Sequence, residues 1–157
     1  MKTTAQSLIA DVANDAKLMR ARATNARKQK ESIALALKLT KNIASNADSF
    51  MGWVTANSYD DKARLHLVAI VRTENMKSIR VGNILTMAEN LNWENEETQD
   101  TAWESGAERQ FRYNTTIANL SVCLEISARI KADGEACRVE QVGVEVNERP
   151  IYAIRCA

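Results

Sequence analysis

Residues 116–130, TIANLSVCLEISARI, alternate strictly between apolar and polar side chains. The apolar set consists of Leu120, Val122, Leu124, Ile126, Ala128 and Ile130. Because successive side chains of a strand point to opposite faces of a sheet, the alternation predicts a half-buried antiparallel strand. This segment therefore predicts that a sheet forms the core of the C-terminal part of the chain.

Two further strands are expected after this segment. KADGEA (131–136) supplies an Asp-Gly turn. CRVEQVGVEV (137–146) changes the phase of its apolar residues beside Gly143, which indicates a β-bulge. After another turn, IYAIRC (151–156) has the composition of a last strand. Together these segments predict a three-stranded antiparallel meander.

Two strands and one helix are expected before it. FMGWVTA (50–56) and ARLHLVAIVR (63–72) are predicted strands, and the second is apolar on both faces, which favours a central position. SIRVGNILTMAENLNW (78–93) has the apolar spacing of a helix that packs on one side. ENEETQDTAWESGAER (94–109) is interpreted as a polar, acidic connection.

The N-terminal segment is predicted to be helical. Neither Gly nor Pro occurs before Gly52, and residues 4–45 are rich in good helix formers. Small and apolar residues recur at a 3-4 spacing, interrupted at Lys30 and Thr40: Ile9, Val12, Ala16, Met19, Ala23, Ala26, Ile33, Leu37 and Ala44. This period indicates a stripe that faces another helix. A single helix of this length would measure ~60 Å, so a break at Thr24-Asn25 is also considered.

The combined pattern predicts an α+β fold in one compact unit of 157 residues. A long helix or helical hairpin occupies residues 1–46. An antiparallel sheet of about five strands, with one covering helix, occupies residues 47–157. No apolar run approaches the ~20 residues that a membrane span requires, so no membrane partner is expected.

The three cysteines indicate a reducing environment. Cys123, Cys137 and Cys156 are an odd number and lack CxxC spacing. Such a pattern favours reduced thiols over a disulfide framework, and with it a cytoplasmic location.

The sequence offers little for catalysis. His66 is the only histidine, and the five glycines do not form a phosphate-binding motif. One histidine and three scattered cysteines also argue against a tetrahedral zinc site. We therefore predict no catalytic residue, no metal ligand and no cofactor, and we favour a protein that is not an enzyme.

Charge is unevenly distributed in a chain whose formal net charge is only +1. Residues 17–30, KLMRARATNARKQK, carry six cations and no acid. Residues 89–108 carry seven acids and neither Lys nor Arg. The two segments can attract each other within a molecule or between copies.

The leading hypothesis is a protein that self-associates or binds a protein partner through the N-terminal stripe, with Ile9, Val12, Ala16, Met19, Ala23 and Ala26 as contact residues. The first alternative is nucleic-acid binding by Lys17, Arg20, Arg27 and Lys28, with Phe111 and Tyr113 of RQFRY (109–113) stacking on bases. A weaker alternative is a metal-dependent enzyme in which acids of residues 89–108 hold Mg²⁺.

Overall fold

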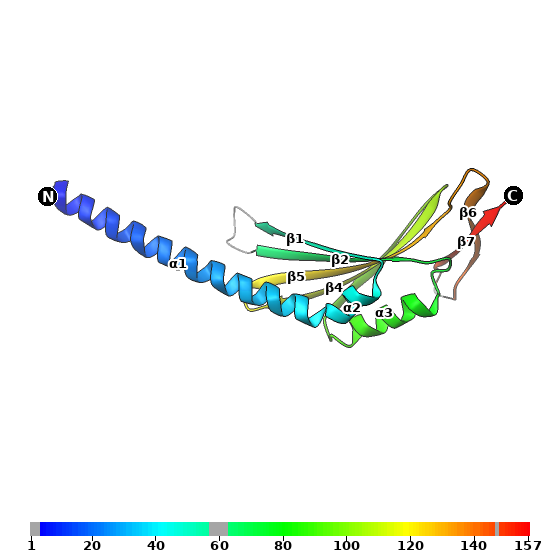
Figure 1. Cartoon of the computed structure of the whole chain (residues 1–157), viewed down its shortest axis with the longest axis horizontal. Helices are drawn as coiled ribbons and strands as arrows, with labels where there is room; N and C mark the ends of the chain where they lie inside the picture. Colours follow the sequence, from blue (N-terminus) through cyan, green and yellow to red (C-terminus); the bar gives the residue numbers. More distant parts are fainter. Residues whose placement is uncertain (1–3, 57–62, 147) are drawn as a thin grey trace.

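A five-stranded sheet forms the centre of the computed structural model, which describes residues 4–56, 63–146 and 148–157 (Figure 1). The strand order is β1-β2-β5-β4-β3, and two more strands form a separate hairpin. The strands are β1 Ser49–Ala56, β2 Ala63–Arg72, β3 Glu94–Trp103, β4 Gly106–Ile117, β5 Leu120–Lys131, β6 Cys137–Val144 and β7 Pro150–Cys156. The helices are α1 Thr4–Leu39, α2 Lys41–Asn46 and α3 Ile79–Glu89. The predicted α+β class is confirmed, with more strands than the five expected.

The central strand β5 confirms the alternation on which the sheet was predicted. It pairs antiparallel with β4 and parallel with β2. All six apolar side chains of the alternating set are buried. Since a large apolar side chain contributes ~1.5–3 kcal/mol when it leaves water, this strand supplies much of the core.

The β2 strand takes the predicted central position, between β1 and β5. Its odd-numbered residues are buried, whereas its even-numbered residues are half-buried or exposed. β2 and β5 run parallel, and α3, β3 and β4 form the crossover connection that parallel neighbours require. The sheet is therefore mostly, but not wholly, antiparallel.

Residues 94–109 form β3 and the start of β4, so the predicted polar connection is wrong. β3 is an edge strand that pairs only with β4, and its register shifts between Glu96 and Gln99. Edge strands accept charged and irregular sequence because one side of the strand meets water. This tolerance explains why the segment lacks the apolar alternation of β5.

The hairpin of β6 and β7 stands apart from the main sheet, so the predicted three-stranded meander is wrong. A register shift between Gln141 and Gly143 confirms the bulge. The hairpin is held to the sheet by Arg109, whose Nε lies 2.8 Å from the Asp100 carboxylate. A terminal nitrogen of the same guanidinium donates to the Pro150 carbonyl oxygen at 3.1 Å.

The α1 helix runs unbroken through Thr24-Asn25, so the single long helix is confirmed and the alternative, a helical hairpin with a break at these residues, is not. Thr24 stays helical while its Oγ1 donates to the Arg20 carbonyl oxygen at 2.9 Å. The chain turns instead at buried Thr40, one of the two positions that interrupt the stripe. Neither α1 nor another helix in the described ranges is long and apolar enough to cross a membrane.

The α3 helix begins where the sequence predicts and ends earlier. The Ser78 Oγ accepts a hydrogen bond from the Val81 amide and caps the first turn. The helix ends at Glu89, and Asn92 then takes a left-handed conformation with φ of 55°. Val81, Ile84 and Ala88 are buried against the sheet.

One face of the main sheet is covered, and we call it the covered face. The last turns of α1, together with α2, α3 and the β6–β7 hairpin, contribute residues to the core on this side (Figure 1). The other face, called the open face, is covered by no helix or strand in the described ranges. The sheet therefore presents one face to the core and the other to water.

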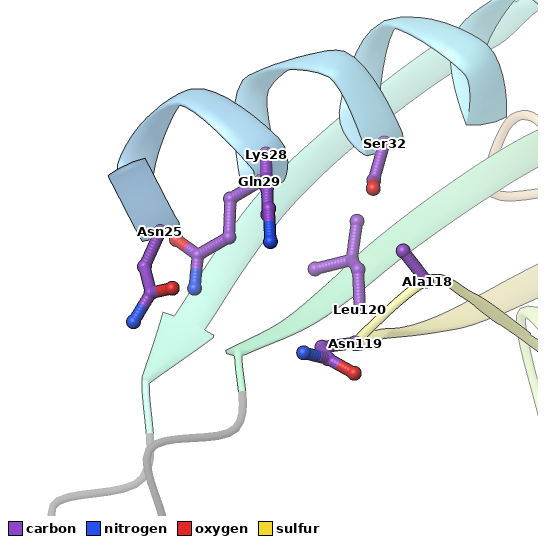
Figure 2. Close-up of a pocket in the computed structure, with 7 residues that line it drawn as sticks. All are labelled: Asn25, Lys28, Gln29, Ser32, Ala118, Asn119 and Leu120. Carbon is purple, nitrogen blue, oxygen red and sulfur yellow. The ribbon is translucent and has the colours of Figure 1, made fainter. Parts of the chain in front are cut away.

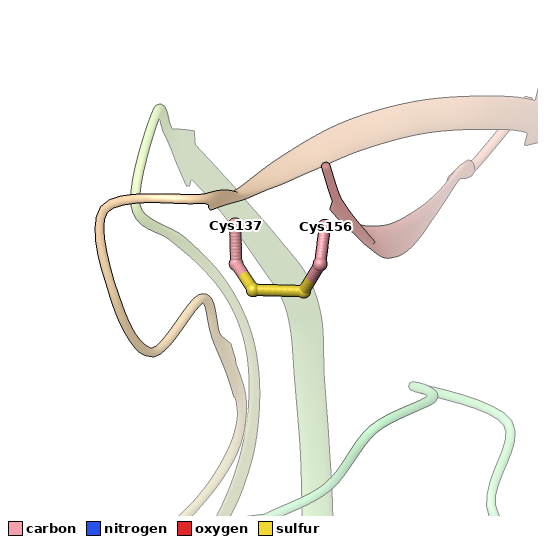
Figure 3. The surroundings of a disulfide bond; sticks show 2 residues. All are labelled: Cys137 and Cys156. Atoms are coloured by element: carbon pink, nitrogen blue, oxygen red, sulfur yellow. A yellow bond between two sulfur atoms is a disulfide. The ribbon is translucent and has the colours of Figure 1, made fainter.

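Cys137 and Cys156 form a disulfide, so the predicted reduction of all three cysteines is wrong (Figure 3). The two residues are direct partners in the β6–β7 register, with Cα atoms 4.0 Å apart. Antiparallel pairing thus brings together two cysteines that are 19 residues apart in sequence. Cys123, in β5, is a free thiol.

Candidate interaction surface

The first 25 residues of α1, residues 4–28, extend away from the sheet (Figure 1), and we call them the arm. The arm leaves the sheet domain at a pocket of about 170 Å³ between α1 and the β4–β5 turn (Figure 2). Its lining residues are Asn25, Lys28, Gln29, Ser32, Ala118, Asn119 and Leu120. Beyond this pocket, α1 buries Ser32 and Ala36.

The predicted stripe lies on the exposed surface of the arm. Ile9, Val12 and Met19 are 70%, 69% and 70% exposed. Ala16, Ala23 and Ala26 are exposed as well. At 3.6 residues per turn, Met19 lies roughly 100° around the helix from Ala36, which faces the sheet domain. The stripe is therefore uncovered within the described part of the chain.

A basic sector lies beside the stripe. Lys17, Arg20, Arg27 and Lys28 are all exposed and fall within roughly 100° of the helix circumference. Arg27 forms an ion pair with Glu31 at 3.3 Å. The other three form no ion pair with any described residue. Among the described residues, no ion pair joins these cations to the acidic segment.

Phe111 and Tyr113 lie apart from these cations, on β4. They share one face of the strand, as expected for an extended RQFRY segment. This is the covered face: Tyr113 is 2% exposed, and Phe111 packs against the core. Their proposed stacking on bases stays a prediction, and the Tyr113 ring is not accessible in this structure.

The acidic segment, residues 89–108, divides into paired and unpaired carboxylates. Asp100 is bound by Arg109, and Glu108 lies 3.3 Å from Arg129. Four exposed acids form no ion pair within the described part of the chain: Glu89, Glu94, Glu96 and Glu104. No group of three or more candidate metal ligands occurs among the described residues.

The strand register orders the open face into rows that cross the sheet. One row consists of Trp53, His66, Cys123, Asn114 and Glu94. The next consists of Met51, Val68, Glu125, Arg112 and Glu96. Each row begins with a large apolar side chain on β1 and ends with a carboxylate on β3. In these two rows the open face is thus apolar at the β1 edge and acidic at the β3 edge.

The middle of the open face is a polar network between β4 and β5. Ser127 and Gln110 donate hydrogen bonds to the Glu108 carboxylate, and Arg129 lies 3.3 Å from it. Burial raises the pKa of Glu108, but these hydrogen bonds and the Arg129 charge outweigh it, so the pKa lies below its ordinary value. Glu108 is therefore held as a carboxylate.

His66 and Cys123 are neighbours in the first row without forming a reactive pair. The His66 ring stacks on Trp53 with centroids 5.3 Å apart, and its Nε2 lies 3.4 Å from the Thr55 hydroxyl. Burial raises the pKa of the Cys123 thiol, which opposes formation of a nucleophilic thiolate. The raised thiol pKa therefore disfavours nucleophilic chemistry at Cys123.

No family model matches the chain, and no curated protein matches it.

Sequence reasoning located the arm residues but missed the open face. The rows form only when β3 and β4 are recognised as strands, and β3 carries no alternation that predicts one. The RQFRY segment could have predicted β4, because its alternation of basic and aromatic residues fits an extended strand.

Proposed function

We propose that this protein is a non-enzymatic interaction protein that self-associates through its arm. The observation that carries the proposal is the exposure of Ile9, Val12 and Met19, each about 70%, on a helix that extends beyond the sheet domain. Burial of three such side chains would contribute several kcal/mol at ~1.5–3 kcal/mol each. The small Ala16, Ala23 and Ala26 between them allow close approach of a partner.

The length of the arm supports the same proposal. Most helical stability in proteins comes from packing of one helix face, and isolated short helices are marginal in water. Within the described chain, only the part of α1 after Gln29 buries side chains against the sheet domain. A second protein surface on the arm would supply the packing that its own domain does not.

The disulfide bears on where the protein works. The expected cytoplasmic location depended on three reduced thiols, but Cys137 and Cys156 are oxidised to a disulfide. Structural disulfides persist mainly in oxidising compartments. We infer that assembly takes place in an oxidising environment.

The double variant Val12→Asp/Met19→Asp should lose self-association. Two carboxylates on the stripe would have to be desolvated on contact, at a cost of several kcal/mol. Sedimentation velocity from about 1 to 100 μM should show concentration-dependent dimers or larger species for the wild type and monomer for the variant.

Asn14→Asp/Ala21→Asp is the matched control, because it has the same seven-residue spacing and adds the same charge on the opposite side of the helix. This control should associate like the wild type. A wild type that stays monomeric over the whole range, or equal loss in both variants, would contradict the proposal.

Nucleic-acid binding remains the second candidate, supported by Lys17, Arg20 and Lys28, which are exposed and form no ion pair in the described structure. It predicts that fluorescence anisotropy with labelled oligonucleotides shows binding that weakens about tenfold or more between 50 and 200 mM salt. Arg20→Glu/Arg27→Glu should abolish this binding. Affinity that is independent of salt would exclude a phosphate-binding arm.

A further inference from the structure

The open face matches the arm in both polarity and charge. It has an apolar edge on β1 and β2 and an acidic edge on β3. The arm has an apolar stripe and, next to it, a basic sector toward its C-terminal end. We propose that the arm of a second copy of this chain lies across the open face, with Val12 over β1, Met19 over β5 and Arg27 near β3. This inference rests on the proposed self-association and adds the surface that receives the arm.

The apolar edge offers a preformed platform. Trp53 is 47% exposed and Met51 is 46% exposed, and both lie on the open face. Parallel stacking on His66, with an interplanar angle of 9°, orients the Trp53 ring in the free chain. Exposed aromatic side chains that are already oriented lose little entropy when a partner covers them, and they are frequent anchors of interfaces.

The acidic edge supplies charges that the chain itself does not neutralise. Glu94 and Glu96 end the rows of Trp53 and Met51 and form no ion pair among the described residues. Arg112 lies between them and the middle of the sheet, but it is paired with Glu125 at 3.2 Å. The two carboxylates are therefore available to Arg20 and Arg27 of an incoming arm.

The other cations of the open face restrict the path of the arm. Arg64 and Arg72 lie at opposite ends of β2, and Arg129 of β5 lies in the same row as Arg72. Lys131 follows on the open face beyond Arg129. These cations would repel the basic sector. The two rows that hold Trp53 and Met51 at one end and the carboxylates at the other are the path with favourable contacts at both edges.

The width of the open face agrees with the length of the arm between Val12 and Arg27. Four strand spacings of ~4.8 Å separate β1 from β3, which gives ~19 Å across the sheet. Val12 and Arg27 are 15 positions apart, or ~22 Å along a helix at 1.5 Å per residue. A helix with Val12 over β1 thus places the Arg27 side chain at the β3 edge.

The arm of the same copy does not compete for this face. Because α1 is one continuous helix with Ser32 and Ala36 buried on the sheet domain, the arm is directed away from that domain (Figure 1). Each copy therefore offers one arm and one free open face. Such a contact is heterologous, because it joins two different surfaces. Two copies that exchange arms form a closed dimer, whereas copies that do not exchange arms form an open chain.

A charge-swap experiment tests the proposed pairing. Glu94→Lys/Glu96→Lys and Arg20→Glu/Arg27→Glu should each weaken self-association about tenfold or more, because like charges then meet. An equimolar mixture should recover an affinity within about threefold of the wild type, since the reversed arm then meets the reversed face. Dissociation constants are measured by sedimentation equilibrium, with circular dichroism to verify folding.

Glu104→Lys/Glu135→Lys is the control, because these acids lie in turns outside the two rows and form no ion pair in the described structure. A photo-crosslinking residue at Met19 provides a test that keeps all charges. Met19 is about 10 Å along the helix from Val12, which is two strand spacings from β1, so its adducts should map to β5 and its neighbour β2 of a second copy. Association without recovery in the mixture, or adducts outside the open face of β2 and β5, would overturn the proposed face while leaving arm-dependent self-association intact. A monomeric wild type would overturn both.

Discussion

Replacement of Leu124 by alanine should lower the free energy of unfolding by about 2–5 kcal/mol. Leu124 is fully buried at the centre of β5, between β2 on one side and β4 on the other. Truncation removes apolar contacts with both neighbours and leaves a cavity that two hydrogen-bonded strands cannot close. Urea denaturation, followed by tryptophan fluorescence and circular dichroism, measures the loss.

The control for this variant is Ile79→Ala, which removes an aliphatic side chain that is 82% exposed at the start of α3. Its effect should stay within about 0.5 kcal/mol. Equal losses for the two substitutions would show that β5 is not the centre of the core.

Arg109→Ala should destabilise the protein by about 3–5 kcal/mol, the range found when one partner of a buried ion pair is removed. Arg109 is only 5% exposed and is bound to Asp100, Glu145 and Pro150. Its loss leaves Asp100 without its cation and releases the connection between the sheet and the β6–β7 hairpin. Hydrogen exchange should accelerate most in residues 137–156.

Arg112→Ala is the matched comparison on the same strand. Its ion pair with Glu125 has a similar geometry, at 3.2 Å, but the Arg112 side chain is 41% exposed. Because exposed pairs contribute ~0–1 kcal/mol, this substitution should have a small effect. If Arg112→Ala were as damaging as Arg109→Ala, burial would not be the reason for the importance of Arg109.

Local sequence patterns predicted the elements in which burial follows the same period as the apolar residues, or in which every residue favours one secondary structure. Every second residue of β5 meets the core, so the alternation from Leu120 to Ile130 was sufficient to predict this strand. The predicted start at residue 116 is wrong, since residues 116–119 form the end of β4 and the turn before β5. The absence of Gly and Pro, together with strong helix formers, was sufficient for α1. The Thr24-Asn25 break failed because intrinsic propensity is weak, and Thr24 satisfies its hydroxyl within the helix.

Other features depend on contacts between distant segments. The Asp-Gly turn suggested that β6 would pair with β5, but Arg109 and the bonds to Asp100 and Pro150 place the hairpin elsewhere. The Cys137–Cys156 bond needs the register of β6 with β7, and spacing in the sequence does not contain that information. The rows of the open face likewise require the order of five strands.

The disulfide also changes what a protease could do to this protein. Cys137 and Cys156 are the first residue of β6 and the last residue of β7, so residues 137–156 form a covalent ring. A single cut inside that ring linearises it without releasing a fragment. The final strand would remain tethered after such a nick, and reduction as well as cleavage would be needed to shed it.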